Sequence, residues 1–279
     1  MNKEQAKGEN VIQIKPASGW QFVNWNELKE YRDLFFFMVW RDIKVLYAQT
    51  IMGFSWAILQ PLIQIVMFTI IFGKVASLPT DGIPYFLFST VAIIPWTYMS
   101  SAMSGSSMSL VSGKAMLGKV YFPRIIFPLT SILSKLVDFS ISLLIVVAVM
   151  IYYKVPLTLN LLYLPLFVVF MAIVPLGVGL WLSSLAIRFR DVNFAMQFFI
   201  RMLMYTAPVV YAVSSIPDEF KFLYSLNPLV SVIEGFRICL LGGTLDWGFL
   251  VPGMVTAVVI LVTGALYFKR TEHIVVDVI

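Results

Sequence analysis

The sequence predicts an all-α integral membrane protein with six transmembrane helices. Three observations indicate this class: 59% of the 279 residues are hydrophobic, only 13% are charged, and long stretches of the sequence contain no charged residue. Soluble domains average about half apolar and about a quarter charged residues, so this composition is typical of a protein that lies in lipid. The length fits one compact membrane domain, which we place at residues 26–270.

Uncharged stretches define the predicted spans, because a helix of about 20 apolar residues crosses the hydrocarbon core of a bilayer. Four stretches lack charged residues entirely, a fifth contains Lys135 and Asp138, and a sixth contains Arg201. Lys135 and Asp138 are three residues apart and can neutralise each other near the membrane surface. In chain order, the predicted spans are 53–73, 85–106, 132–153, 162–187, 193–213 and 248–268.

The basic residues between the spans predict the orientation, since cytoplasmic loops carry an excess of Lys and Arg. Of the 20 Lys and Arg residues, two lie within spans and fourteen lie on the same side as both termini. The four on the other side are Lys74, Lys154, Lys221 and Arg237. We therefore expect a cytoplasmic segment 1–25 and a cytoplasmic tail 271–279. The positive net charge reflects this topology, and we expect no nucleic-acid partner.

Two segments are neither spans nor simple loops. Residues 26–47 contain an apolar run, Leu34 to Trp40, between charged ends, which predicts an amphipathic helix along the inner membrane surface. The segment 214–247 alternates charges with short apolar runs and predicts short re-entrant helices between spans five and six, covered by protein. Aromatic residues such as Trp96 and Tyr152 are predicted to anchor span ends at the membrane interface.

The predicted cytoplasmic loop 107–130 carries three basic residues and no nucleotide-binding motif. Gly113-Lys114 is followed by Ala115 instead of Ser or Thr, and no glycine stands at the spacing that the first glycine of a P-loop requires. The chain has one cysteine, Cys239, and one histidine, His273, so an internal disulfide or a histidine-based metal site is not expected. We expect no cofactor in this chain and no catalytic residues.

Polar stripes on two predicted spans are candidates for a substrate path. The residues, spaced for one helical face, are Gly53, Trp56, Gln60 and Gln64 on the first span and Gln197, Arg201, Tyr205 and Pro208 on the fifth. An amide or a charge facing hydrocarbon is costly, so these faces should meet protein or water. Channel lining and helix packing remain alternatives, and Arg201 could meet a pyrophosphate on a substrate or pair with Asp191 or another internal group.

Small residues on the second and fourth predicted spans have the same two interpretations. Ser100, Ser104 and Ser107 share one face of the second span. They either let another helix approach closely or line a channel with hydroxyl groups. Gly177 and Gly179 are expected to have a packing role only.

A series of short motifs surrounds the predicted spans. They are YRDL at 31–34, WRDIK at 40–44, YAQT at 47–50, GFSWAILQP at 53–61, KVYFPR at 119–124, RFRDV at 188–192, PVVY at 208–211, LNP at 226–228 and IEGFR at 233–237. Over residues 16–270 the chain resembles the membrane subunit of type-2 ABC exporters, specifically the polysaccharide and O-antigen exporters of Gram-negative bacteria. At Leu46 and Ala48 the sequence departs from the basic residues frequent in that family.

The resemblance implies a homodimer with a continuous channel and two separate ATPase subunits that bind ATP and Mg²⁺. It implies that ATP hydrolysis drives a lipid-linked polysaccharide from the inner leaflet of the bacterial inner membrane to the periplasmic side. Membrane lipids would surround the protein. The N-terminal helix and the loop between spans two and three would contact the ATPase. The candidate contacts are Arg41, Asp42, Lys44, Lys114, Lys119, Tyr121 and Arg124.

Three other functions remain open at this point. A related ABC exporter could carry teichoic acid or a small molecule. A secondary transporter usually couples ions through carboxylates or broken helices near the membrane midplane, but the only acid within a predicted span is Asp138, near the inner end. A membrane glycosyltransferase would need clustered acidic or metal-binding residues at one face, and the acids here are sparse.

Overall fold

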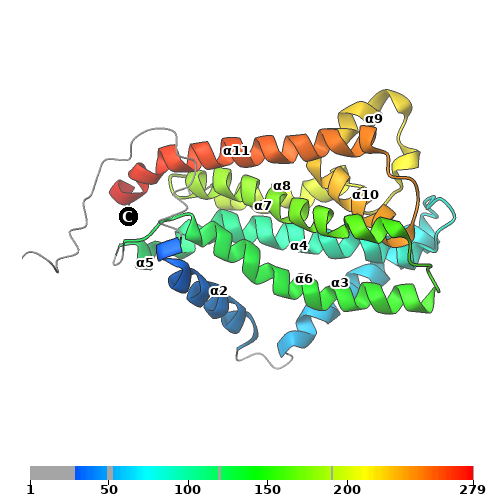
Figure 1. Cartoon of the computed structure of the whole chain (residues 1–279), viewed down its shortest axis with the longest axis horizontal. Helices are drawn as coiled ribbons and strands as arrows, with labels where there is room; N and C mark the ends of the chain where they lie inside the picture. Colours follow the sequence, from blue (N-terminus) through cyan, green and yellow to red (C-terminus); the bar gives the residue numbers. More distant parts are fainter. Residues whose placement is uncertain (1–28, 49–52, 119–120, 190, 279) are drawn as a thin grey trace, which may run out of the picture.

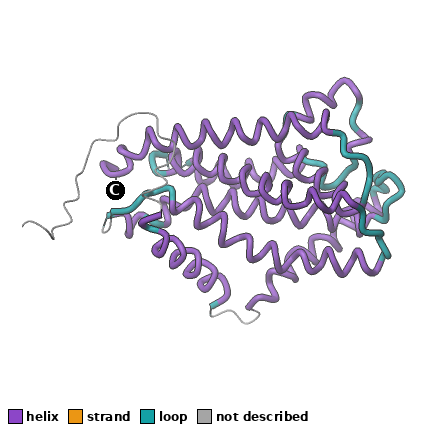
Figure 2. Tube along the Cα trace, in the orientation of Figure 1, coloured by secondary structure: helices purple, strands orange, loops and turns teal. Residues whose placement is uncertain are grey.

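The structure is a computed structural model that describes residues 29–48, 53–118, 121–189 and 191–278. In these ranges it consists of helices joined by short loops and contains no β-strand (Figures 1 and 2). The α-helices are α2 (Arg32–Tyr47), α3 (Trp56–Phe68), α4 (Tyr85–Ser112), α5 (Lys114–Leu117), α6 (Ile126–Tyr152), α7 (Leu164–Ala186), α8 (Val192–Thr206), α9 (Asp218–Ser225), α10 (Pro228–Leu241) and α11 (Trp247–Val278).

Five helical segments of the described ranges are long and apolar enough to cross a membrane. They are Gly53–Val75, Tyr85–Ser112, Ile126–Tyr152, Leu159–Ala186 and Trp247–Glu272. The first combines a 3-10 turn (Gly53–Ser55), α3 and a π-helical stretch (Thr69–Val75), and the fourth joins a 3-10 turn (Leu159–Tyr163) to α7.

The sixth predicted span, 193–213, does not form one long helix. Helix α8 has 15 residues and a length of about 22 Å, which is less than the hydrocarbon thickness. It ends where Ala207 adopts an extended conformation with ψ of 150°. The physical reason is Pro208, because a proline disfavours the α conformation of the residue before it. The expectation of six spanning helices is thus not confirmed.

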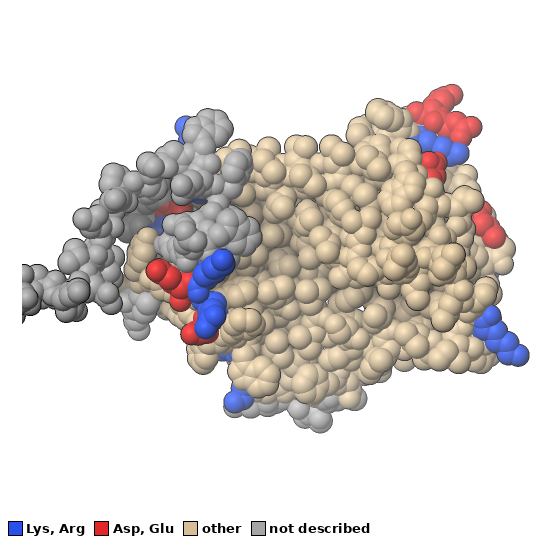
Figure 3. Space-filling view, viewed as in Figure 1, with Lys and Arg blue, Asp and Glu red and all other residues tan. Residues whose placement is uncertain are grey.

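Charged side chains gather at the two ends of the molecule. Figure 3 shows Lys, Arg, Asp and Glu at both ends of this face and a broad band without charges between them. The end of α11, helix α5 and the oblique helix α2 share one end, whereas α9 lies at the other (Figure 1). Such a charge-free band between charged ends is the surface expected of a protein embedded in a bilayer.

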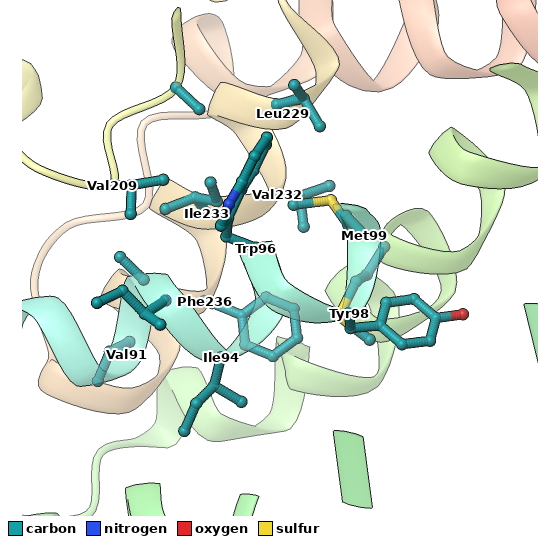
Figure 4. Close-up of a cluster of buried hydrophobic side chains, with 14 of the residues drawn as sticks. Val91, Ile94, Trp96, Tyr98, Met99, Val209, Leu229, Val232, Ile233 and Phe236 are labelled. Carbon is teal, nitrogen blue, oxygen red and sulfur yellow. The ribbon is translucent and has the colours of Figure 1, made fainter. Parts of the chain in front are cut away.

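Helix α4 is the centre of the bundle and packs against α3, α6, α7, α8 and α10. Trp96 is only 4% exposed and, in Figure 4, projects from α4 into the space bordered by Val209, Leu229 and Ile233. The prediction that Trp96 anchors a span end is therefore wrong. Tyr152, at the end of α6, is 79% exposed, as expected for a residue at a span end.

Close approach of the helices depends on small residues. A Cβ atom on Gly177 of α7 would lie 2.8 Å from the backbone nitrogen of Leu261 in α11. One on Gly179 would lie 2.0 Å from the hydroxyl oxygen of Ser106 in α4. The predicted packing role of both glycines is thus confirmed by contacts with two different helices.

The segment 214–247 contains two short helices, of which α9 is mostly exposed and α10 mostly buried. Asn227 caps α10: its side-chain oxygen accepts a hydrogen bond from the Leu229 backbone nitrogen at 3.1 Å, and Pro228 occupies the first turn. Helix α10 packs against α4, α7 and α11. It is therefore part of the bundle core and not a surface appendage.

A second, smaller core supports the end of the molecule that holds α2 and α5. It joins Met38 of α2 to Leu110, Phe122, Ile126, Phe127, Leu180 and Phe268. Helix α4 continues to Ser112, beyond the predicted boundary at 106, and the connection to α6 is shorter than the predicted loop 107–130. The extension is compatible with the serines there, because Ser106 and Ser109 bond their hydroxyls to carbonyls three residues back.

Candidate functional site

The polar stripe of the first span lies mainly on the outside of the single chain. Trp56 is 49% exposed, Gln60 is exposed and Gln64 is half-buried on α3. Pro61, on another face of the same helix, is buried. This chain alone therefore leaves the Gln60 amide uncovered in a helix apolar enough to span a membrane. That amide requires water or a second protein surface.

The stripe on α8 is also exposed over most of its length. Gln197, Arg201 and Tyr205 are exposed, whereas Pro208, just beyond the helix, is buried. Arg201 forms no ion pair with any residue that the structure describes, and Asp191 at the helix start is itself exposed. The interpretation that Arg201 pairs with Asp191 is therefore not seen in this single chain.

Helix α4 contacts both helices that carry the stripes, since α3 and α8 each pack against it. Its serines satisfy their own hydroxyl groups. The Ser100 hydroxyl donates to the Thr97 carbonyl at 3.1 Å, and the Ser107 hydroxyl donates to the Ser104 carbonyl at 2.9 Å. Ser100 and Ser104 are half-buried and Ser107 is buried. This internal bonding lets small polar side chains sit at a helix contact without leaving a buried hydroxyl unpaired.

The segment 207–212 after α8 is non-helical and buried, except for the half-buried Tyr211. Side chains from α4 and α10 bind its carbonyl groups. Tyr85 bonds the Val210 carbonyl at 2.8 Å and Arg237 bonds the Pro208 carbonyl at 2.5 Å, and the Asn227 amide bonds the carbonyl of Thr206, the last residue of α8, at 3.1 Å. Buried backbone carbonyls need such partners, so the surrounding helices make an irregular segment possible inside the bundle.

Arg237 is the best-buried charge of this region, with 6% of its surface exposed. Its guanidinium bonds the Glu234 carboxylate at 2.6 Å and lies 3.9 Å from the centre of the Phe88 ring on α4. An ion pair and an aromatic face together offset the cost of removing the charge from water. We expected Arg237 in the outer segment 214–247, covered by protein, and the structure buries its side chain against α4.

The predicted ATPase contacts lie on α2, on α5 and in the connection that follows α5. Arg41 and Asp42 form an ion pair at 2.7 Å, Lys44 and Lys114 are exposed, Tyr121 is 79% exposed and Arg124 is half-buried. Lys119 lies outside the described residues. The elements α2 and α5 share one end of the molecule (Figure 1), so this end presents both groups of candidates together.

Comparison with known families now decides what these helices belong to. The sequence profile of the ABC-2 type transporter family matches residues 33–241, three quarters of the chain. The chain belongs to the ABC-2 type transporter family. The match begins in α2 and ends with α10, so the ABC-2 region contains both exposed stripes and the buried Arg237.

Curated relatives of this ABC-2 protein match it over most of their own length. It is 25% identical over 242 residues to the O-antigen export system permease protein RfbA of Klebsiella pneumoniae, covering 86% of this chain and 93% of the relative. For RfbA of Myxococcus xanthus the identity is 28% over 214 residues, with coverages of 76% and 81%. For the polysialic acid transport protein KpsM of Escherichia coli it is 24% over 244 residues, with coverages of 83% and 91%.

The main residues that sequence reasoning missed in this ABC-2 chain are Glu234, Arg237 and Tyr85. The spacing of Glu234 and Arg237 allows an i,i+3 pair on a helix, and both lie in an apolar setting. That pattern was the available signal for a buried pair. Nothing in the sequence alone connects either residue to Tyr85 or to the carbonyl groups of segment 207–212, which are far away along the chain.

Proposed function

We propose that this ABC-2 protein is the membrane subunit of an ATP-driven exporter that moves lipid-linked polysaccharide of the O-antigen type across the bacterial inner membrane. The observation that carries the proposal is the match, over most of both chains, to O-antigen export permeases and to a polysialic acid transport protein. The exposed amide and aromatic groups on α3 and α8 support it, because sugar chains bind through hydrogen bonds and aromatic faces.

The chain would cross the membrane a sixth time along α8 and segment 207–212. The supporting observation is the arrangement of the ends: α5 and the end of α11 lie at one end of the molecule and α9 at the other (Figure 1). An even number of crossings puts both termini on one side, which the excess of basic residues assigns to the cytoplasm. Helices α9 and α10 would then enter the outer leaflet, with the buried α10 shielded by α4, α7 and α11.

The functional unit would be a homodimer whose transport path runs along α3 and α8. Both helices expose polar or charged side chains that hydrocarbon does not accommodate, namely Gln60 on α3 and Arg201 on α8. A second copy facing these helices would enclose them and leave water, sugar or protein as their environment. Arg201 would then be free to bind a phosphate of the substrate.

ATP would be hydrolysed by separate subunits that bind the end of the molecule formed by α2 and α5. The exposed Lys44, Lys114 and Tyr121 and the half-buried Arg124 lie on the elements that form that end. The purified chain alone should therefore show no ATP turnover, which an assay free of contaminating ATPase can measure. Turnover by the isolated chain would contradict this part of the proposal.

The whole proposal is tested by removing the gene from its host and measuring surface polysaccharide and cytoplasmic lipid-linked polysaccharide. We expect the polymer to disappear from the surface and to accumulate inside, since synthesis continues without export. Complementation with the unchanged gene should restore export. A strain with normal surface polysaccharide and an altered distribution of another cargo, such as a small molecule, would favour a related exporter with a different substrate.

A further inference from the structure

The carboxylate of Asp138 on α6 binds side chains from two elements. The hydroxyl of Tyr47, the last residue of α2, donates a hydrogen bond to one carboxylate oxygen. The Lys135 ammonium, one turn earlier on α6, lies 3.4 Å from the other oxygen, which confirms the predicted Lys135–Asp138 pair. Burial and the hydrogen bond to Asp138 raise the pKa of Tyr47 above its ordinary value.

The same part of α6 also holds the beginning of the first span. Ser142 lies one turn after Asp138, and its hydroxyl donates to the Ala57 carbonyl of α3 at 2.8 Å. The Tyr47 ring stacks on Phe54, directly before α3, with 4.0 Å between the ring centres. Thus the end of α2, the start of α3 and one turn of α6 meet at a single junction.

Away from this junction, α2 and the first span lie at the periphery of the bundle, where α3 buries Pro61 and Ile65 and also packs against α4. Met38 is the one buried side chain of α2, and it belongs to the small core at the opposite end of that helix from Tyr47. In the first span, Gly53–Val75, only 11% of the most apolar stretch is buried, compared with 39% in the span that contains α6. We call α2 and Gly53–Val75 together the α2–α3 arm.

We propose that Asp138 is a positioning residue that fastens the α2–α3 arm to α6, so that α2 and the first span turn about this junction as one body during transport. This inference rests on the proposed function, because it assigns to α2 the transmission of ATPase-driven movement. A charge pair within the spanning helix Ile126–Tyr152 is weak evidence for added stability. A charged hydrogen bond has a defined direction, however, so it suits a joint that must hold one orientation while the helices beyond it move.

Tyr47→Phe removes only the hydroxyl that reaches Asp138. The double variant Lys135→Leu/Asp138→Leu removes the Asp138 carboxylate together with the Lys135 ammonium. It therefore tests the junction without leaving Lys135 unpaired. Tyr152→Phe serves as the matched control, because Tyr152 is exposed at the other end of α6. In the assembled complex we expect Tyr47→Phe and the double variant to lower polymer exported per ATP hydrolysed by at least about fivefold. Their amounts in the membrane should equal those of the control.

A second measurement does not depend on the cargo. Spin labels at Phe36 of α2 and Ile63 of α3, both exposed, report the distance across the arm in a Cys239→Ala background, with labelled copies diluted by unlabelled ones. We expect one narrow distance that ATP does not change in the unmodified junction, and a broad distribution in Tyr47→Phe and in the double variant.

Two results would overturn the inference. One is a distance across the arm that changes with ATP in the unmodified junction, or that stays narrow in both variants. The other is a proportional loss of protein, hydrolysis and export, which indicates a purely structural role for Asp138. If the complex with the unmodified junction exports no polysaccharide, the proposed function fails, and the spin-label distances still decide whether the arm is one body.

Discussion

Helices α3 and α4 are both apolar enough to span a membrane, but their surroundings in the bundle are opposite. In α4 78% of the most apolar stretch is buried, whereas in the span containing α3 the share is 11%. The buried helix is the less hydrophobic one, with a mean hydropathy of 1.2 against 1.8. Hydropathy therefore reports that a helix belongs in the bilayer and says little about whether its neighbours are protein or lipid.

The polar residues of the two helices are treated differently. The serines of α4 bond their hydroxyls to carbonyls of the same helix, so they pack inside the bundle at little cost. Gln60 of α3 has a larger amide that one carbonyl cannot satisfy, and it lies on an exposed face. The comparison teaches that short polar side chains permit close packing, whereas long ones on a peripheral span point to a surface that becomes covered in the assembly.

The largest effect is expected at the charge packed against α4. Arg237→Leu leaves the half-buried Glu234 carboxylate without its partner, which should cost about 3 kcal/mol and reduce the accumulation of folded protein. The matched variant Glu234→Leu/Arg237→Leu removes both charges and should recover much of that loss. Thermal unfolding in detergent and the amount in the membrane measure both. Equal damage by the single and double variants would show that Arg237 acts mainly through the Pro208 carbonyl.

Overpacking around α7 should have the next largest effect. Gly177→Val places new atoms against the backbone of Leu261, which cannot rotate away, and should cost about 3 kcal/mol. Gly105→Ala on α4 is the control, because its new Cβ would be 3.5 Å from Ser131, an ordinary contact. The same unfolding measurement compares them. A stable Gly177→Val protein would mean that α7 and α11 can separate without loss of the fold.

On α3 we expect transport to fall without loss of protein. Gln60→Leu/Gln64→Leu should insert and accumulate normally, since leucine suits a spanning helix, while export should fall at least about fivefold, equivalent to about 1 kcal/mol. Ile63→Leu, at an exposed apolar position of the same helix, should export normally. Surface polymer relative to membrane protein is the measurement. Normal export by the double variant would remove this stripe from the path, and a parallel fall of both quantities would assign it to packing.

The smallest effect on transport is expected from substitutions at the end of the molecule opposite α9, where we predict that the ATPase subunit binds. Single cysteines at Lys114 and Lys119 should crosslink to the ATPase subunit in membranes and leave transport nearly unchanged before crosslinking. The background is low, because the only native cysteine, Cys239, is buried. The prediction is contradicted if a bulky soluble thiol reagent labels both cysteines freely in the assembled complex, because a partner then covers neither position.

Composition and charge-free stretches were enough to predict an all-helical membrane protein, five of its spanning segments and the packing role of Gly177 and Gly179. Those predictions depend on local properties, namely the length and hydropathy of a helix and the absence of a side chain. The motifs also led to the right family, ahead of any information on three-dimensional contacts. The polar stripes on α3 and α8 were visible as periodic patterns, and their proposed role in transport stays a prediction.

Tertiary structure alone decided which polar groups are buried and what they bind. The sequence placed Trp96 at a membrane interface, but the helices around α4 bury it, and only the structure shows that Arg237 is buried against Phe88 and the Pro208 carbonyl. It also predicted a full span, whereas α8 ends before Pro208, Asn227 bonds the last residue of α8, and the side chains of Tyr85 and Arg237 bond the irregular segment that follows. These outcomes depend on partners far away along the chain, and a local pattern of hydropathy or charge does not encode which partners meet.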